Sequence, residues 1–93
     1  MKIALEVKFL DGTTQKAVAQ FVDFIAFERA HNRSVAKFET ELKLTDLAWM
    51  AWHVEKRNRR TTLEFDPWLE TVEAVEVGED AKIVPLESTQ PTG

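Results

Sequence analysis

The chain of 93 residues contains no cysteine and only three glycines, which lie far apart at positions 12, 78 and 93. Because cysteine is absent, the chain forms neither a disulfide framework nor a thiolate metal site, which fits a reducing cytosol. Because the glycines are isolated, a glycine-rich phosphate-binding loop is excluded. Long apolar runs are missing too, since the longest, residues 44–54, is shorter than a bilayer-spanning helix. The charged residues within positions 1–6 do not fit a signal peptide, so we expect a soluble protein with no membrane partner.

Side chains that commonly carry catalysis or bind metals are also few. The two histidines, His31 and His53, lie far apart and neither begins a His-x-x-x-His pair, so no zinc motif is present. Ser34 and Ser88 are the only serines, and neither lies in a Gly-x-Ser-x-Gly turn. We therefore expect no catalytic residue, no metal ion and no cofactor. Each histidine is interpreted as an ordinary surface or half-buried side chain, and a metal site would need a carboxylate brought near by the fold.

The charge is distributed unevenly along the chain. Residues 1–63 carry 11 basic and 8 acidic side chains, whereas residues 64–93 carry one basic and 8 acidic side chains. An acidic end repels phosphate backbones, so we expect no nucleic-acid partner. The basic run at residues 56–60 is interpreted as the end of a helix whose cations match the helix dipole, with Glu64 and Glu70 as candidate partners. The alternative for this run is a nucleic-acid patch beside two tryptophans.

The first twenty residues have the pattern of a β-hairpin. From Lys2 to Phe9, apolar side chains alternate with polar or small ones, which predicts a half-buried strand. Asp11-Gly12 follows, and such a pair supplies the positive φ angles of a tight turn. A returning strand is expected over residues 14–21, although residues 16–20 also fit a helix.

Three or four short helices are expected after the hairpin. Asp23 is interpreted as the cap of a helix that ends near His31. Residues 32–34 are interpreted as a break. Ser34 is a candidate cap for a short turn that contains Val35, Phe38 and Leu42.

The clearest helix is expected to begin at Thr45, a good N-cap residue, with Asp46 placed where the helix dipole favours negative charge. Trp49 and Trp52 form a second apolar stripe beside the main one, so the helix is apolar on nearly every side. Such a helix is either central to the fold or partly exposed to a partner. The main stripe, at helical spacing, consists of Leu47, Met50, Ala51 and Val54.

A last helix is expected to begin at Asp66-Pro67 and to end at Gly78. Its apolar face would carry Leu69, Val72 and Val75, and its solvated face would carry Glu70, Glu73 and Glu76. We expect residues 1–77 to form a single globular domain and residues 78–93 to form a flexible acidic tail rich in proline and threonine. The fold class is predicted as α+β, an N-terminal β-hairpin followed by three or four short helices. The alternative is an all-α fold with one stray strand.

Three tryptophans and six phenylalanines are many for a chain of this length. A domain of this size has a limited interior, and tryptophan exposed beside apolar neighbours is a typical interface anchor. We therefore expect one face of the central helix to be a contact surface. The candidate partner-binding residues are Leu47, Trp49, Met50, Trp52, Phe65 and Trp68.

Three short segments, in order within residues 22–76, together resemble the small tail assembly chaperones of long-tailed bacteriophages. The resemblance implies a protein that binds the long helical tape measure protein in the cytoplasm of the infected bacterium and is absent from the mature virion. Many members of that family exist in two lengths because of programmed frameshifting, and the end of this chain is consistent with a short form or with the join to an extension. The segments are Ala26-Phe27-Glu28-Arg29, Leu47-Ala48-Trp49-Met50-Ala51-Trp52-His53 and Phe65-Asp66-Pro67-Trp68-Leu69-Glu70.

The resemblance also implies a mechanism in which an apolar helix face shields an apolar stripe of the tape measure protein. The acidic tail would keep the complex in solution, and self-association along the tape measure protein is expected because one small domain covers little of a long helix. The alternative function is a small acidic regulatory or inhibitor protein that binds a host protein through its acidic end, with the negative charge clustered at residues 64–87 mimicking nucleic acid and Glu70, Glu73 and Glu76 as the test positions. Replacing the tryptophans or neutralising these glutamates would separate the two hypotheses.

Overall fold

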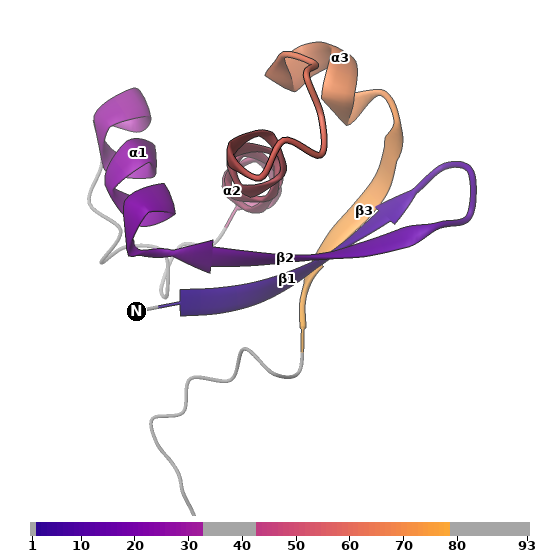
Figure 1. Cartoon of the computed structure of the whole chain (residues 1–93), viewed down its shortest axis with the longest axis horizontal. Coiled ribbons are helices and arrows are strands. Elements are labelled where there is room, and N and C mark those ends of the chain that lie inside the picture. Colours follow the sequence, from indigo (N-terminus) through magenta and orange to yellow (C-terminus); the bar gives the residue numbers. More distant parts are fainter. Residues whose placement is uncertain (1, 33–42, 79–93) are drawn as a thin grey trace, which may run out of the picture.

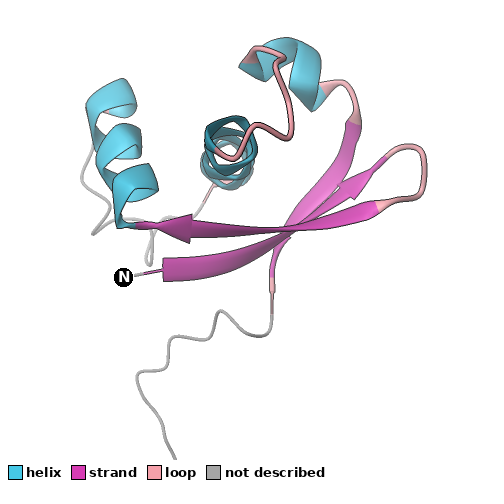
Figure 2. Ribbon diagram, viewed as in Figure 1, coloured by secondary structure: helices cyan, strands magenta, loops and turns pink. Residues whose placement is uncertain are grey.

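A computed structural model of the chain describes residues 2–32 and 43–78, in which three helices lie on one face of a three-stranded antiparallel sheet (Figures 1 and 2). The strand order is β2-β1-β3, so the first strand of the chain is the central one. The predicted α+β class and the N-terminal hairpin are therefore confirmed. In chain order the elements are β1 Lys2–Phe9, β2 Thr14–Gln20, α1 Phe21–His31, α2 Leu44–Arg57, α3 Phe65–Leu69 and β3 Val72–Val77.

The hairpin forms as its alternating pattern predicts. Strands β1 and β2 pair from Lys2 opposite Gln20 to Lys8 opposite Thr14. In the turn, Gly12 has a φ of 94°, and the Asp11 carboxylate accepts hydrogen bonds from the backbone N–H of Thr13 at 2.8 Å and from its hydroxyl at 2.6 Å. The helical alternative for residues 16–20 is wrong, and β2 ends one residue earlier than expected because α1 begins at Phe21.

The predicted helix from Asp66 to Gly78 is wrong beyond its first turns. Helix α3 ends at Leu69, where Thr71 closes it by donating from its backbone N–H and its hydroxyl to the carbonyl oxygen of Trp68, at 2.9 and 2.7 Å. The following residues form strand β3, which pairs antiparallel with β1. Valine is β-branched and favours strands, and pairing with β1 packs two partly buried valines against the core.

A β-bulge explains why this strand has helical spacing in the sequence. Val75 lies opposite Val7, and Val72 lies opposite Phe9. The two valines are three positions apart on β3, whereas their partners are two positions apart on β1, so β3 contains one extra residue. The bulge lets side chains three positions apart face the same side of the sheet, which in a regular strand would require an even separation.

The N-caps of the three described helices lie two or three residues earlier than predicted. Gln20 is the N-cap of α1, and Asp23 closes the capping box from the third helical position. Helix α2 starts after Lys43 rather than at Thr45, and α3 starts after Glu64 rather than at Asp66. The predicted break after α1 agrees with Asn32, which is the C-cap with a φ of 53°. The predicted turn at residues 34–42 and most of the predicted tail lie outside the described residues.

The core lies between the sheet and the three helices. The side chains of Leu5 and Val7 on β1 point into it, as do Phe24 and Phe27 on α1. The opposite face of the sheet is covered by no helix of the described residues, as Figure 2 shows. The predicted α2 stripe forms the helical side of this core: Leu47, Met50, Ala51 and Val54 are all buried.

Candidate interaction surface

The six predicted partner-binding residues fall into two groups. Leu47, Met50 and Trp68 are core residues, with 6%, 1% and 2% of their surface exposed. These three side chains are therefore not available at the surface of this fold, and the predicted contact surface is corrected to exclude them. The others, Trp49, Trp52 and Phe65, are half-buried.

The half-buried rings form one continuous group, which we call the aromatic surface and define as His31, Trp49, Trp52, His53 and Phe65. The centroids of Trp49 and Trp52 lie 5.8 Å apart, and those of Trp52 and Phe65 lie 5.7 Å apart, both edge to face. His53 stacks on Trp49 with centroids 5.2 Å apart and planes 15° apart. His31 meets Trp49 edge-on at 4.9 Å. Both histidines of the chain thus contact one indole.

Trp52 is fixed at the edge of α2 by polar contacts. Its indole N–H donates to the carbonyl oxygen of Leu63 at 2.9 Å, which ties the loop between α2 and α3 to the helix. The ammonium group of Lys56 lies 5.3 Å from the centroid of the Trp52 ring and 2.8 Å from the Glu64 carboxylate. The aromatic surface therefore has an apolar centre and a charged rim, which is the usual layout of a protein interface.

A buried carboxylate lies behind the aromatic surface. Asp23 on α1 is fully buried and accepts the backbone N–H of Gln20 at 2.8 Å. It also accepts both Nε–H and Nη2–H of Arg57, at 2.9 and 2.8 Å, and the Nδ1–H of His53 at 2.7 Å. Burial alone raises the pKa of Asp23, but these hydrogen bonds outweigh it and hold the pKa below its usual value of 3.8.

A second buried acid lies further along α2. Glu55 is 3% exposed and pairs with Arg60 at 3.0 Å. Burial raises the pKa of this carboxyl above its usual value, and the hydrogen bond from Arg60 only partly opposes the shift. With these two pairs the basic run is largely explained by folding: Arg57 pairs with Asp23, Arg60 with Glu55 and Lys56 with Glu64.

Of the partners predicted for the basic run, Glu64 is confirmed, but the two buried acids were missed. Asp23 is 34 residues from Arg57 in the chain, so no local spacing relates them. The contact between His53 and Trp49 does have a signal in the sequence, because residues four apart lie on the same face of a helix.

A metal site would require a carboxylate near a histidine. Such a carboxylate is present, but it already binds the guanidinium of an arginine. Asp23 lies 2.7 Å from His53, and the Arg57 guanidinium binds the same carboxylate. Among residues 2–32 and 43–78, no three side chains of metal-binding type lie together. Both serines, Ser34 and Ser88, lie outside the described residues.

The three glutamates of the alternative hypothesis do not share a helix face. Glu70 caps the end of α3, and Glu73 is the extra residue at the β3 bulge. Glu76 lies on β3 opposite Glu6 and 3.4 Å from Lys8. The fold therefore spreads these charges over a helix end and a strand.

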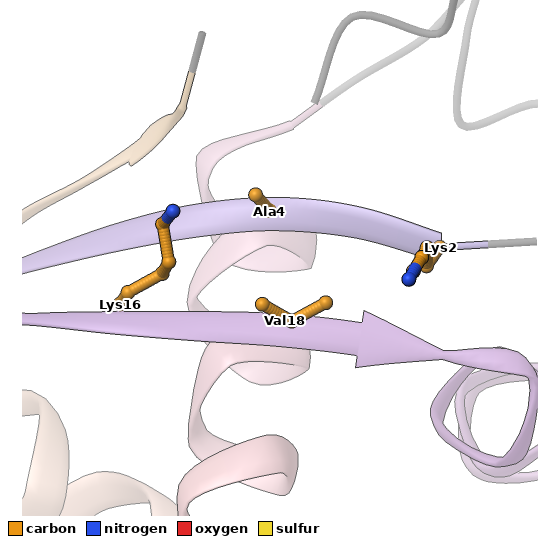
Figure 3. Close-up of a pocket in the computed structure, with 4 residues that line it drawn as sticks. All are labelled: Lys2, Ala4, Lys16 and Val18. Carbon is orange, nitrogen blue, oxygen red and sulfur yellow. The ribbon is translucent and has the colours of Figure 1, made fainter. Parts of the chain in front are cut away.

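The open face of the sheet carries a hollow of about 250 Å³ (Figure 3). Ala4 and Val18, which are paired across β1 and β2, form its floor, and Lys2 and Lys16 flank it. Two lysines on an apolar floor supply neither a general acid–base pair nor a metal site. The aromatic surface is the stronger candidate.

No family model matches the chain, and no curated protein or solved structure is significantly similar to it. No helix in the described part of the chain has both the length and the apolar character that crossing a bilayer requires.

Proposed function

We propose that this chain is a non-catalytic binding protein whose aromatic surface holds an apolar stripe of a helical partner. Specifically, we propose a tail assembly chaperone of a long-tailed phage, with the tape measure protein as partner. The observation that carries the proposal is the half-burial of Trp49, Trp52 and Phe65 in one group of rings. Indole and phenyl rings left partly exposed side by side are typical anchors of protein interfaces.

The positions of the three chaperone-like segments support the proposal. The first lies on α1, the second on α2 and the third begins with α3. Aromatic side chains from all three segments belong to a single chain of ring contacts: Phe27 lies 5.9 Å from Trp49, Trp49 lies 5.8 Å from Trp52, and Trp52 lies 5.7 Å from Phe65. Three segments distant in sequence thus build one aromatic layer, with Phe27 beneath the surface.

The proposed mechanism is reversible shielding. A tape measure segment with an exposed apolar stripe would aggregate before tail assembly, and the aromatic surface would cover part of that stripe. The protein would act in the host bacterial cytoplasm and be absent from the mature virion, with no nucleic-acid or membrane partner. Self-association along the partner and a longer frameshifted form belong to the same proposal.

The test is a titration of the chain with overlapping helical segments of the tape measure protein from the same phage. We expect at least one segment to bind, and the Trp49→Ala, Trp52→Ala double variant to weaken binding by at least about 30-fold, because interface tryptophans commonly contribute 2 kcal/mol or more. The control replaces Glu70, Glu73 and Glu76 with glutamine. Binding that survives loss of both indoles, or that disappears only in the glutamine variant, contradicts the proposal and favours the acidic inhibitor.

A further inference from the structure

We propose that Asp23 is a positioning residue for the aromatic surface: its buried carboxylate fixes the ring of His53, and that ring fixes the indole of Trp49 against which a partner packs. The link from Asp23 to Trp49 stands on geometry alone. Only the last step, the effect on a partner, rests on the proposed function.

The first step is the bond between Asp23 and His53. The two residues lie on different helices. The carboxylate is held by the backbone N–H of Gln20, the N-cap residue of α1, and by the guanidinium of Arg57 on α2. The imidazole therefore donates at 2.7 Å to an acceptor that is itself immobile. A short hydrogen bond to an ionised acceptor restricts the rotation of the ring.

The second step is the stack of His53 on Trp49. These residues are four apart on α2, so their side chains share one helix face. The planes of His53 and Trp49 differ by 15°, whereas Phe27, His31 and Trp52 meet the indole at 68°, 85° and 62°. His53 thus stacks on the indole, whereas the other three rings are steeply inclined to it.

A fixed indole matters for binding because ordering a side chain at an interface opposes association. If Trp49 is already held in one orientation by the buried carboxylate, little of its rotational freedom remains to be lost. A turned His53 would release the stacked face and let the indole sample other rotamers. The buried network would then contribute to affinity without touching the partner.

The test measures the indole N–H resonances of the free protein by NMR, with the Trp49 signal assigned from a Trp49→Phe variant. Asp23→Asn places an amide N–H₂ group against donors of Arg57 or His53 and breaks the link. We expect it to shift and broaden the Trp49 signal while the signal of the buried Trp68 stays in place. His53→Phe keeps a ring but removes the donor, and His53→Gln keeps a donor but removes the ring. Both are expected to move the Trp49 signal as Asp23→Asn does.

Glu55→Gln is the matched control, because Glu55 is a second buried carboxylate, and it pairs with Arg60, just beyond the end of α2, rather than with His53. It is expected to leave the Trp49 signal unchanged. In the His53→Phe background, adding Asp23→Asn is expected to shift the signal no further, because both changes break the same link.

An unmoved Trp49 signal in folded Asp23→Asn, or one that moves equally in Glu55→Gln, overturns the proposal. Should Asp23→Asn not fold, His53→Phe decides, since it leaves the Asp23–Arg57 pair intact. With a bound tape measure segment, Asp23→Asn is expected to weaken affinity up to about tenfold, less than loss of the indole itself. Because the NMR test uses the free protein, it is independent of whether the proposed partner binds.

Discussion

At the residue scale, Asp23 shows how a fully buried charge is kept in a small domain. An isolated carboxylate at 0% exposure would cost several kcal/mol, of the order that destabilises a whole domain of this size. The planar guanidinium of Arg57 binds both carboxylate oxygens, which is the geometry in which arginine and carboxylate interact most strongly. The ion pair of Asp23 with Arg57 therefore links α1 to α2.

The acid dependence of stability follows from the same group. The folded-state pKa of Asp23 is below its unfolded value of 3.8, so its contribution is present above that value and is lost as the pH falls through the folded-state pKa. Glu55 works in the opposite direction, since its raised pKa favours the protonated form in the folded protein. We expect the free energy of unfolding, measured in urea, to fall below about pH 4 in the native chain.

In Asp23→Asn, the same measurement should give a lower free energy of unfolding at pH 7, by about 2–4 kcal/mol, and a flatter dependence on the acid side. Glu55→Gln is expected to leave the acid-side decrease in place. An Asp23→Asn protein that loses stability with acid as steeply as the native chain would contradict the assignment to Asp23.

None of this network could be predicted from the sequence. In the sequence, Asp23 is interpreted as a helix cap, and that local role gives no sign of the two partners 30 and 34 residues away that the fold brings to its carboxylate. Partners at such separations are set by how helices pack, which no local spacing contains. His53 was expected to be an ordinary surface or half-buried side chain, and it is half-buried.

At the element scale, α2 has two apolar faces with different roles. The face with Leu47, Met50 and Val54 closes the core, and the face with Trp49 and Trp52 remains half-exposed. The sequence predicted both stripes, because helical spacing alone determines which residues share a face. The sequence placed Leu47 and Met50 among the partner-binding residues, although both are buried in the core. Both stripes are apolar enough to be buried, so spacing alone does not show which one faces the core.

This division predicts unequal costs for two truncations. Met50→Ala leaves a cavity in a fully packed region and is expected to lower the free energy of unfolding by about 2–5 kcal/mol. Trp52→Ala removes a larger side chain but exposes a site that is already partly hydrated, so we expect a smaller loss, about 1–2 kcal/mol. Urea unfolding of both variants measures the difference, and a Trp52→Ala loss as large as that of Met50→Ala would place Trp52 in the core.

Strand β3 shows where element prediction fails. Leu69, Val72 and Val75 follow a spacing of three, and a helix start precedes them, so the pattern predicts one long helix. The bulge at Glu73 produces the same spacing in a strand. These residues form a strand rather than a helix because they pair with the edge of β1 that β2 leaves free, more than sixty residues earlier in the chain. Pairing across that distance is invisible to a local pattern.

At the scale of the whole molecule, the described elements share one core. Leu5 of β1, Ala17 of β2, Phe24 of α1, Met50 of α2 and Trp68 of α3 belong to the same buried cluster, and Val75 of β3 packs against it. No helix or strand among these residues has a separate apolar interior of its own. The mixed class was predictable because the hairpin and the central helix have strong local patterns, whereas the third strand was not.

A single shared core predicts that the protein unfolds in one cooperative transition. Circular dichroism of the helices and sheet, and tryptophan fluorescence, which reports on the buried Trp68 and the half-buried indoles, should give coincident urea curves with a slope of about 1–3 kcal/mol per molar urea. Curves that separate, with the fluorescence change first, would show that the aromatic surface loosens before the sheet and that the core is divided.

A tape measure segment that binds only the folded chain should displace both curves together, by about 2.7 kcal/mol at a hundredfold excess over its Kd. A segment that shifts the fluorescence curve alone would instead be binding a partly unfolded chain, so the coincidence of the two curves with partner present tests fold and function in one measurement.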